Sequence, residues 1–290
     1  MPEWTAEFVV GERLARRLLA EQFPELEPAR LELLGEGWDN TAWLVDGALV
    51  FRFPRREIAV AGVRREIALL PALAPLLPLP VPVPHFVGRP SNAFPWPFFG
   101  GPVVPGIELA RAELDEERRS LLARPLAEFL RALHSADVAV DLPVDPIDRA
   151  EMPRRVARTR ARLDELGGIP PEAEPVLERA LELPPPAYTA VVHGDLHLRH
   201  VLVDEGRLSG VIDWGDACRS DPAVDLVPVW CALSPGSRSE FFSVYGAVEE
   251  PALVRARVLS LFLCAVLAIH ARAEGLADVE RESLAVSGGR

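Results

Sequence analysis

The spacing of hydrophobic and polar positions changes its period several times along the N-terminal third of the chain. Residues 6–22 repeat apolar side chains at helical spacing, whereas residues 31–53 switch to short β-like runs broken by glycine and by Asp-Gly. The Asp46-Gly47 pair marks a hairpin before residues 48–53. Helical spacing returns at about residues 60–74. The pattern therefore predicts a helix, a three-stranded unit and a second helix.

Prolines then crowd the segment from Pro71 to Pro105 too densely for helix interiors. This segment predicts extended edge strands and a crossover between two lobes. We expect the boundary near Gly100–Gly106. The expected domains are a nucleotide-binding lobe over residues 1–104 and a catalytic and substrate-binding lobe over residues 105–290.

The remainder of the chain is mainly helical in its pattern. Helical spacing marks residues 120–136, where we expect Pro125 to bend the helix, and also residues 152–166 and 172–183. A long apolar helix follows at about 251–273. One β patch interrupts the helices, with the runs "TAVV" (189–192), "VLVD" (201–204) and "LSGVIDW" (208–214). A β-rich first lobe followed by a mainly helical second lobe is an α+β, bilobal organisation.

Composition narrows the possible partners and the compartment. The chain carries 43 acidic against 31 basic residues, a net charge of −12, which argues against non-specific nucleic-acid binding. All 31 basic residues are arginine, so any role that usually falls to lysine must be filled by arginine.

The three cysteines lack disulfide or zinc spacing, which favours the reducing cytoplasm. The apolar stretch Val258–Ile269 looks too short to span a membrane and predicts a buried helix.

Two aspartates in the β patch are the first candidates for chemistry. Asp195 and Asp213 each follow an apolar strand-like run, and a hairpin-sized connection joins the two runs. Their carboxylates can therefore converge, close to the histidines of "HGDLHLRH" (193–200). Converging carboxylates suit Mg²⁺, which completes its shell with water and substrate phosphates. Magnesium in turn implies a phosphate-bearing substrate.

A nucleotide site has one candidate loop in the N-terminal third. The stretch "GEGWDN", which contains Gly35, Gly37 and Asn40, lies between two expected strands. Its backbone amides can lie over phosphates. By itself, a loop with two glycines is more often a tight turn than a phosphate cradle, so this signal alone decides nothing.

The order of these stretches, however, resembles a known family. "GEGWDN" is followed by "LVFRFPRR" (49–56), "RREIALL" (64–70), "HGDLHLRHVLVD" (193–204), "GVIDWGDA" (210–217) and "SDPAVDLV" (220–227). This set resembles the aminoglycoside phosphotransferase-like family, whose fold is that of protein kinases. Within the family it looks most like the macrolide phosphotransferases and one group of aminoglycoside phosphotransferases.

The resemblance implies a role for each matching residue. Asp195 would be the catalytic base for the acceptor hydroxyl, and His193 would brace the loop through its ring. Asp213, at the position of the kinase Asp-Phe-Gly aspartate, would hold Mg²⁺. Arg52 would replace the kinase lysine that grips the α- and β-phosphates, with Glu66 as its ion-pair partner.

His200 departs from the wider kinase pattern, which has asparagine at this position. The resemblance implies that His200 is a second metal ligand and a marker of the subfamily. The nucleotide base should meet the crossover "GGPVVPG", where the two prolines lack amide donors. Val103 or Val104 would then be the backbone donor, and Val104 is our choice for the site.

Several neighbouring residues are better interpreted as structural. Asp221, before Pro222, is typical of a helix N-cap, and Asp225 would reach back to brace the catalytic loop. Asp216 is equally compatible with a capping role and with facing the metal or the substrate. His134 is typical of packing at a helix end.

The resemblance implies an Mg²⁺-dependent enzyme that moves the γ-phosphate of ATP or GTP to a hydroxyl of a small molecule, such as an aminoglycoside or a macrolide. Three alternatives remain open. The first is a metabolite kinase of the same fold, resembling choline or homoserine kinases, and the second is a catalytically inactive nucleotide-binding pseudokinase. The third is a metal-dependent hydrolase with a cluster made of His193, Asp195, His197, His200 and Asp213. No membrane or nucleic-acid partner is expected, and the oligomeric state is open.

Overall fold

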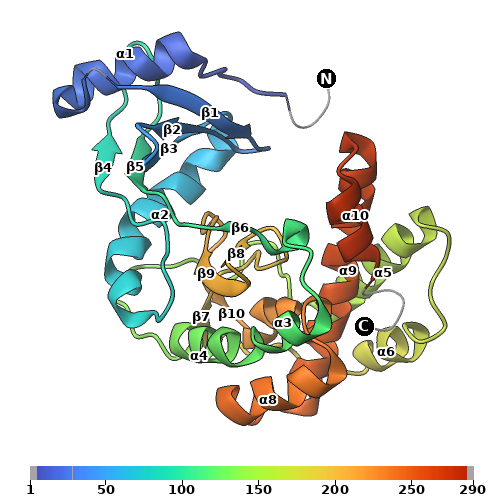
Figure 1. Ribbon diagram of the computed structural model, residues 1–290. Coiled ribbons are helices and arrows are strands. Elements are labelled where there is room, and N and C mark those ends of the chain that lie inside the picture. The colour runs from blue at the N-terminus through green and yellow to red at the C-terminus, as the bar shows by residue number, and fades with distance from the viewer. Residues whose placement is uncertain (1–4, 28, 286–290) are drawn as a thin grey trace.

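The N-terminal part of the protein is a twisted antiparallel sheet. The computed structural model describes residues 5–27 and 29–285. Five strands lie in the order β1-β2-β3-β5-β4, with α1 above the sheet and α2 below it (Figure 1). These elements are α1 (Glu12–Gln22), β1 (Leu31–Glu36), β2 (Asn40–Val45), β3 (Leu49–Pro54), α2 (Val60–Leu73), β4 (Phe86–Gly88) and β5 (Phe98–Pro102).

The three-stranded unit predicted over residues 31–53 is confirmed. Asp46 and Gly47 both have positive φ, 52° and 68°, the amide of Ala48 donates to the carbonyl of Val45, and Val45 pairs with Leu49 across a three-residue loop. The first helix is shorter than predicted, because α1 begins at Glu12 after an N-cap at Gly11. The segment before it is irregular, and the amides of Glu7 and Phe8 donate to the carbonyl of Arg55.

Aromatic rings fill the space between α1 and the sheet. Phe51, Phe53, Phe94 and Phe98 are all completely buried, and the Phe53 and Phe98 rings stack with centroids 4.7 Å apart. Gly100 on β5 is required by this packing, since a Cβ there would lie 2.5 Å from the Phe51 ring. The opposite face of the sheet is left for α2 and the polar groups described below.

The proline-rich segment is extended over most of its length, as predicted. Only Pro71 lies inside a helix, in the last turn of α2, and a 3₁₀ turn follows at Ala74–Leu76. The chain then forms β4 and β5 and passes through Val103–Gly106 into the second part of the molecule. The division at residues 104/105 stays a prediction.

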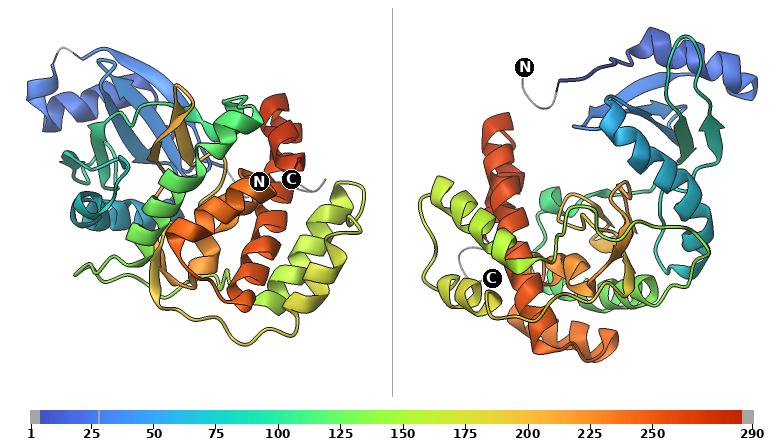
Figure 2. Two further views of the ribbon diagram at one scale, coloured as in Figure 1. Left: turned by 60° about the horizontal axis from the view of Figure 1, so that its bottom comes forward. Right: turned by 180° about the vertical axis from the view of Figure 1, so that it is seen from behind.

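The second part is mainly helical, with short strands at its centre (Figure 2). Its helices are α3 (Glu116–Ser120), α4 (Ala123–His134), α5 (Met152–Glu165), α6 (Glu174–Ala180), α7 (Val227–Cys231), α8 (Pro235–Tyr245), α9 (Glu250–Glu274) and α10 (Ala277–Leu284). The predicted bend at Pro125 is wrong. The helix is instead interrupted at Leu121–Leu122, and Pro125 lies in the first turn of α4, where a missing amide costs nothing.

The long apolar helix is confirmed as α9, but the argument from its length is wrong. The stretch Val258–Ile269 is part of a 25-residue helix that is long and apolar enough to cross a membrane. Its packing supports the prediction of a buried helix, because α9 lies against α5, α6, α7 and α10. Leu259, Cys264 and Ala268 face the core.

Two small sheets hold the polar loop between the helices. In one, β6 (Ile107–Glu108) pairs with β8 (Val201–Asp204), which pairs with β9 (Arg207–Val211). In the other, β7 (Ala190–Val192) pairs with β10 (Cys218–Ser220). The loop from His193 to His200 therefore has a strand of a different sheet at each end, which holds it rigidly.

Candidate active site

The loop His193–His200 turns sharply between β7 and β8. Gly194 has a φ of 88°, and a Cβ at this position would lie 2.3 Å from the carbonyl oxygen of Asp216, so only glycine fits. Leu196 and Leu198 are buried and anchor the loop in the core. The Asp195 side chain, next to Leu196, remains 34% exposed, so it can meet a substrate.

His193 braces this loop, as the sequence predicted. Its Nε2 donates to the carbonyl of Ile212 at 2.9 Å, and its Nδ1 accepts from the amide of Asp195 at 3.2 Å. Burial lowers the pKa of His193, so the neutral ring with this tautomer is favoured. Both ring nitrogens are engaged. His193 is therefore removed from the five-residue metal cluster that the hydrolase alternative needs.

Asp225 fixes the start of the same loop, which confirms its predicted bracing role. Its carboxylate accepts from the amides of His193 at 2.6 Å and Gly194 at 3.0 Å. His134, at the end of α4, lies 3.3 Å from the same carboxylate and 2.6 Å from the Tyr245 hydroxyl. Asp221 caps the next turn by accepting from the amide of Ala223, also as predicted.

His200 and Asp213 face each other across the site. The Nδ1 of His200 donates to the carbonyl of Asp195 at 2.8 Å, which leaves Nε2 with its lone pair. That Nε2 lies 3.5 Å from Oδ2 of Asp213. An imidazole nitrogen and a carboxylate oxygen at this separation can bind one cation together. The geometry is compatible with the predicted metal pair.

His197 belongs to a different set of contacts. Its Nδ1 accepts from the amide of Arg199 at 3.2 Å, so the proton of the neutral ring resides on Nε2. That Nε2 lies 3.6 Å from Oδ2 of Asp195. Burial, together with the neighbouring His200, lowers the pKa of His197 well below its usual range. Asp195, His197 and His200 form a compact cluster, but a protonated Nε2 is a donor to the carboxylate and not a metal ligand.

Arg52 on β3 joins the two parts of the molecule at the site. It donates from Nη1 to Oε1 of Glu66 on α2 at 2.5 Å, which confirms the predicted ion pair, and from Nη2 to Oδ1 of Asp213 at 2.7 Å. Glu66 is completely buried, and it also accepts from the amide of Trp214 at 3.1 Å. The pairing of Arg52 with Asp213 was not foreseen, because the two residues are 161 positions apart.

These contacts set the ionisation of the carboxyl groups. Burial raises the pKa of Glu66 to about 7, although Arg52 opposes the shift. Burial acts in the same direction on Asp213, but Arg52 and His200 outweigh it and hold the pKa of Asp213 well below its usual range.

Partial burial raises the pKa of Asp195 to about 7, with Asp216 and Asp213 adding to the shift. Asp213 is thus an anion, whereas Asp195 is poised to exchange a proton near neutrality.

The loop between β1 and β2 is a braced turn. The amide of Gly37 donates to the carbonyl of Asn40 at 2.9 Å, and Arg55 donates to the carbonyl of Gly37 at 2.7 Å. The Gly37 amide is therefore engaged within the loop. No neighbour lies close enough to Gly35 to require a glycine there. The phosphate-binding role of Gly35, Gly37 and Asn40 stays a prediction.

The crossover leaves one of its two valine amides available. The amide of Val103 donates to the carbonyl of Ala48 at 2.9 Å, so this amide is not available to a nucleotide base. Over residues 5–27 and 29–285, no hydrogen bond uses the amide of Val104. Its side chain packs over Gly210 on β9, where a Cβ would lie 2.2 Å from Cγ1 of Val104. Of the two predicted donors, only Val104 therefore remains free to serve a nucleotide base.

Arg149 is a site residue that the sequence did not reveal. Its guanidinium is buried and donates to Oδ1 of Asp145 and to Oδ1 of Asp216, both at 2.6 Å. Asp216, which had two possible roles, is held by this contact with half of its side chain exposed. The motif "DPIDR" (145–149) preceding α5 carried the only local signal, an Asp-Arg pair four residues apart.

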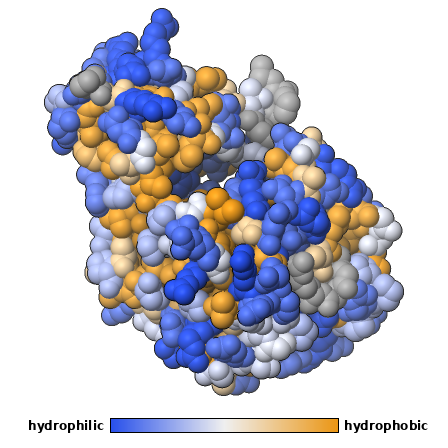
Figure 3. All heavy atoms as spheres, in the orientation of Figure 1, coloured by the Kyte–Doolittle hydropathy of each residue, from blue (hydrophilic) through white to orange (hydrophobic). Residues whose placement is uncertain are grey.

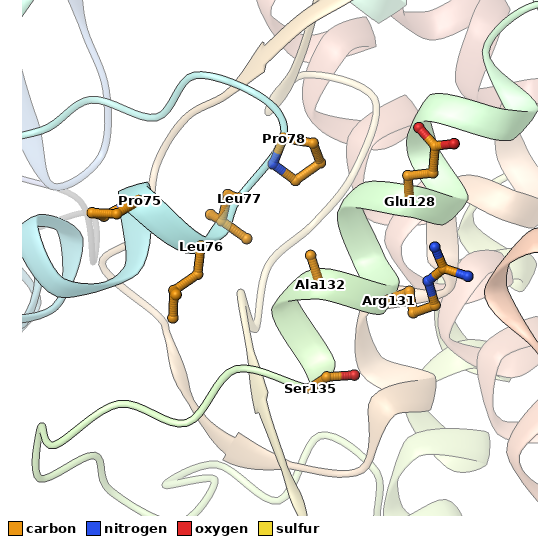
Figure 4. A pocket seen from close by; sticks show the side chains of 8 residues that line it. All are labelled: Pro75, Leu76, Leu77, Pro78, Glu128, Arg131, Ala132 and Ser135. Atoms are coloured by element: carbon orange, nitrogen blue, oxygen red, sulfur yellow. The ribbon is translucent and has the colours of Figure 1, made fainter.

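One pocket lies away from these residues. It is formed between the 3₁₀ turn after α2 and the helix α4, and Figure 4 shows its lining side chains. They are Pro75, Leu76, Leu77, Pro78, Glu128, Arg131, Ala132 and Ser135. None of the predicted site residues is among them, so the convergence of Asp195, His200 and Asp213 remains the stronger indication of an active site.

Comparison with known proteins gives consistent results. Residues 30–259 match the model of the phosphotransferase enzyme family. An aminoglycoside 3′-phosphotransferase of Escherichia coli is 31% identical over 206 residues, 65% of this chain and 71% of the relative. The GDP and kanamycin complex of APH(2″)-IIIa superposes with a TM-score of 0.71 at 25% identity, covering 94% of this chain and 97% of that one. A macrolide 2′-phosphotransferase type I shares the fold, with a TM-score of 0.62, 22% identity and coverage of 97% and 98%.

Proposed function

Because the chain belongs to the phosphotransferase enzyme family, we propose that it transfers the γ-phosphate of ATP or GTP to a hydroxyl group of an antibiotic, either an aminoglycoside or a macrolide. One observation carries the proposal. Asp195, His200 and Asp213 converge at the point where Arg52, paired with Glu66, joins the sheet to the helical part through its contact with Asp213. That arrangement suits phosphoryl transfer, in which positioning and charge stabilisation do most of the catalysis.

Asp195 is the group placed to handle the acceptor hydroxyl. In the proposed step the hydroxyl oxygen attacks the γ-phosphorus, the bond to the bridging oxygen of the nucleoside diphosphate breaks, and the hydroxyl proton passes to the Asp195 carboxylate. A pKa of about 7 suits this exchange, because the group is partly ionised at neutral pH and still basic enough to accept a proton.

His200 and Asp213 are the residues that would hold Mg²⁺. The donor set fits, since Asp213 is held ionised by Arg52 and Nε2 of His200 carries a free lone pair. When bound, Mg²⁺ would neutralise charge on the β- and γ-phosphates and complete its shell with water and phosphate oxygens. His200 is oriented for this role by its bond to the carbonyl of Asp195.

Arg52 and Val104 would position the nucleotide. The planar guanidinium of Arg52 can bind phosphate oxygens in a bidentate manner, and Glu66 on α2 keeps it in place. The free amide of Val104 would donate to the base. The same scaffold would serve a metabolite kinase, so the choice of acceptor has to be tested directly.

We also propose a cytoplasmic location, because Cys218, Cys231 and Cys264 are free thiols.

A matrix of nucleotides against acceptors tests this function. Phosphate transfer from ATP and from GTP is measured with kanamycin, erythromycin, choline and homoserine, with Mg²⁺ present or chelated. We expect Mg²⁺-dependent transfer to an antibiotic, and loss of that transfer in Asp195→Ala. Transfer to choline or homoserine alone would establish the metabolite kinase instead. Nucleotide binding without any transfer would favour a pseudokinase.

A further inference from the structure

The start of the loop His193–His200 depends on the carboxylate of Asp225. This carboxylate is completely buried, and it accepts from the amides of His193 and Gly194. The two residues directly precede Asp195, so a shift of Asp225 also shifts the proposed base. A misplacement of reacting groups by about 1 Å can slow a reaction by about 100-fold. The groups that hold Asp225 in place therefore bear on catalysis.

His134 on α4 meets Asp225 from the other side. Its Nε2 lies 3.3 Å from Oδ2 of Asp225, and its side chain is 6% exposed. An ionised carboxylate only accepts hydrogen bonds, so this contact needs a hydrogen on Nε2. A neutral imidazole carries one hydrogen, and its other nitrogen presents a lone pair. The tautomer with the hydrogen on Nδ1 would turn the lone pair of Nε2 toward the carboxylate and lose the contact.

Tyr245, the last residue of α8, is placed to select between these tautomers. Its hydroxyl oxygen lies 2.6 Å from Nδ1 of His134. Burial raises the pKa of Tyr245, with Asp225 and Asp221 adding to the shift, so the phenol keeps its hydrogen. A hydroxyl that donates to Nδ1 leaves the hydrogen of the ring on Nε2, where it can be donated to Asp225.

The packing of α8 on α4 sets the position of Tyr245. Its ring stacks on that of Phe241, one turn earlier in α8, with centroids 5.4 Å apart and planes at 17°. Arg131 on α4 donates to the carbonyl of Val244 at 2.8 Å, which satisfies an acceptor at the end of α8. Arg131 and His134 are three positions apart on one face of α4. The end of α8 is therefore held to α4 at two adjacent points.

These contacts lie on the side of the helical part that is remote from the sheet. The helix α8 is at the bottom of the molecule in Figure 1, whereas the cleft between the two parts appears as a hollow above the centre in Figure 3. His134 and Asp225 stand between Tyr245 and the loop. Any effect of the Tyr245 hydroxyl on Asp195 therefore passes through these two side chains.

We propose that Tyr245 is a positioning residue for the transfer reaction: its hydroxyl donates to Nδ1 of His134, keeps the hydrogen of that ring on Nε2, and so holds Asp225 in place behind the loop His193–His200. The inference rests on the proposed phosphotransferase function for its effect on the rate. The tautomer of His134 and the order of the loop can be measured without any acceptor.

The first measurement is the tautomer of His134 in protein labelled with nitrogen-15. Ring-nitrogen chemical shifts at pH 8 should show the hydrogen on Nε2, and the signals are assigned by their loss in His134→Gln. Tyr245→Phe should give a mixture of both tautomers. Its melting temperature is recorded, and the amides of His193 and Gly194 should exchange with solvent about tenfold faster than in wild type.

Tyr188→Phe is the matched control. The chain has two tyrosines, and within residues 5–27 and 29–285 the hydroxyl of Tyr188 makes no hydrogen bond. The control therefore removes the same group without removing a contact. It should keep the tautomer of His134, the exchange rates of the loop amides and the transfer rate of wild type.

Transfer rates test the consequence for catalysis. Tyr245→Phe should lower kcat about tenfold while KM for the nucleotide stays within about twofold, a division that a general loss of folded protein does not produce. His134→Gln presents an N–H group to Asp225 that does not depend on a tautomer. In the His134→Gln background, Tyr245→Phe should therefore change kcat by less than about twofold.

Three results overturn the role of Tyr245 and leave the phosphotransferase function intact. They are a hydrogen on Nδ1 of His134 in wild type, a wild-type kcat in Tyr245→Phe, and an equal loss of kcat in the His134→Gln background. If wild-type protein transfers phosphate to no acceptor, the proposed function fails instead. The tautomer and the amide exchange then still decide whether Tyr245 holds the loop.

Discussion

At the scale of single residues, the two aspartates of the site differ in ionisation because they differ in neighbours. Arg52 lies 2.7 Å from Asp213, which keeps that carboxyl ionised and suited to a cation. Asp195 has no such cation in contact. Its partial burial and the charge of Asp213 and Asp216 raise its pKa to about 7. These environments support the proposed division of roles, in which Asp213 holds the metal and Asp195 accepts the proton.

Activity should depend on pH through Asp195. The base must be unprotonated to accept a proton, so kcat/KM should fall about tenfold for each pH unit below about 7. The stability effect has the opposite sign. Since the folded pKa exceeds the unfolded value of 3.8, ionised Asp195 opposes folding, and stability from this group is lost as pH rises from 3.8 to about 7.

Asp195→Asn tests both effects. The variant should lose transfer by at least about 100-fold. Its melting temperature should exceed that of wild type by more at pH 8 than at pH 5, because the wild-type penalty grows between pH 3.8 and pH 7. A wild-type pH profile that is flat from pH 5 to 8, in steady-state assays with saturating metal, would contradict the assignment of Asp195 as the base.

His200 should be replaceable by another metal ligand. His200→Asn keeps a donor atom, so we expect retained activity with a changed preference among Mg²⁺ and Mn²⁺, whereas His200→Ala should lose most of it. Transfer rates across a metal titration measure the difference. A fully active His200→Ala would remove His200 from the metal site.

At the scale of elements, β3 and α2 are joined by a buried ion pair. Arg52 is 13% exposed and Glu66 1%, and Glu66 also accepts the amide of Trp214, next to Asp213. One carboxylate therefore links the sheet, α2 and the segment after β9 that carries Asp213. The pair positions Arg52 for phosphate, although a buried pair is not by itself evidence of stability.

Removing only one partner should be costly. Arg52→Ala leaves Glu66 buried without its cation, and we expect a loss of about 3 kcal/mol in the free energy of unfolding, measured with urea. The double variant Arg52→Met with Glu66→Leu should recover most of this stability, because no charge is left buried. Both variants should be inactive. Equal destabilisation of the single and double variants would show that packing, and not the unpaired charge, causes the loss.

At the scale of the whole molecule, the site exists only where the two parts meet. The sheet supplies Arg52 and the β1–β2 loop, the helical part supplies Asp195, His200 and Asp213, and Val104 lies on the segment between them. A nucleotide that contacts all of these groups binds only the folded protein. Its binding must therefore stabilise the fold as a unit.

Nucleotide should raise the melting temperature through Val104. At a concentration 100 times its Kd, a ligand adds about 2.7 kcal/mol to the stability of the fold. Val104→Pro removes the free amide and should abolish most of the shift caused by Mg²⁺ and ATP or GTP. Val104→Ala keeps the amide and serves as the control. If Val104→Pro shows the wild-type shift, the base is not held by this amide.

Local sequence predicted most of the elements and some of the site's contacts. The Asp46-Gly47 turn, the loop His193–His200 and the cap at Asp221 follow from residue type and spacing, and the structure confirms them. The length of α1 and the break before α4 were missed, since helix ends depend on competing tertiary contacts.

What the sequence alone determined is the chemistry available at each position: which carboxylates, imidazoles and arginines occur, and which strands and turns carry them. Tertiary structure alone decided which of these groups meet. The contacts of Arg52 with Asp213, Arg149 with Asp216 and Trp38 with His270 join distant segments. Hydrophobic periodicity reports which face of an element is buried, but not what lies opposite it. That choice follows from how the sheet and the helices pack across the cleft.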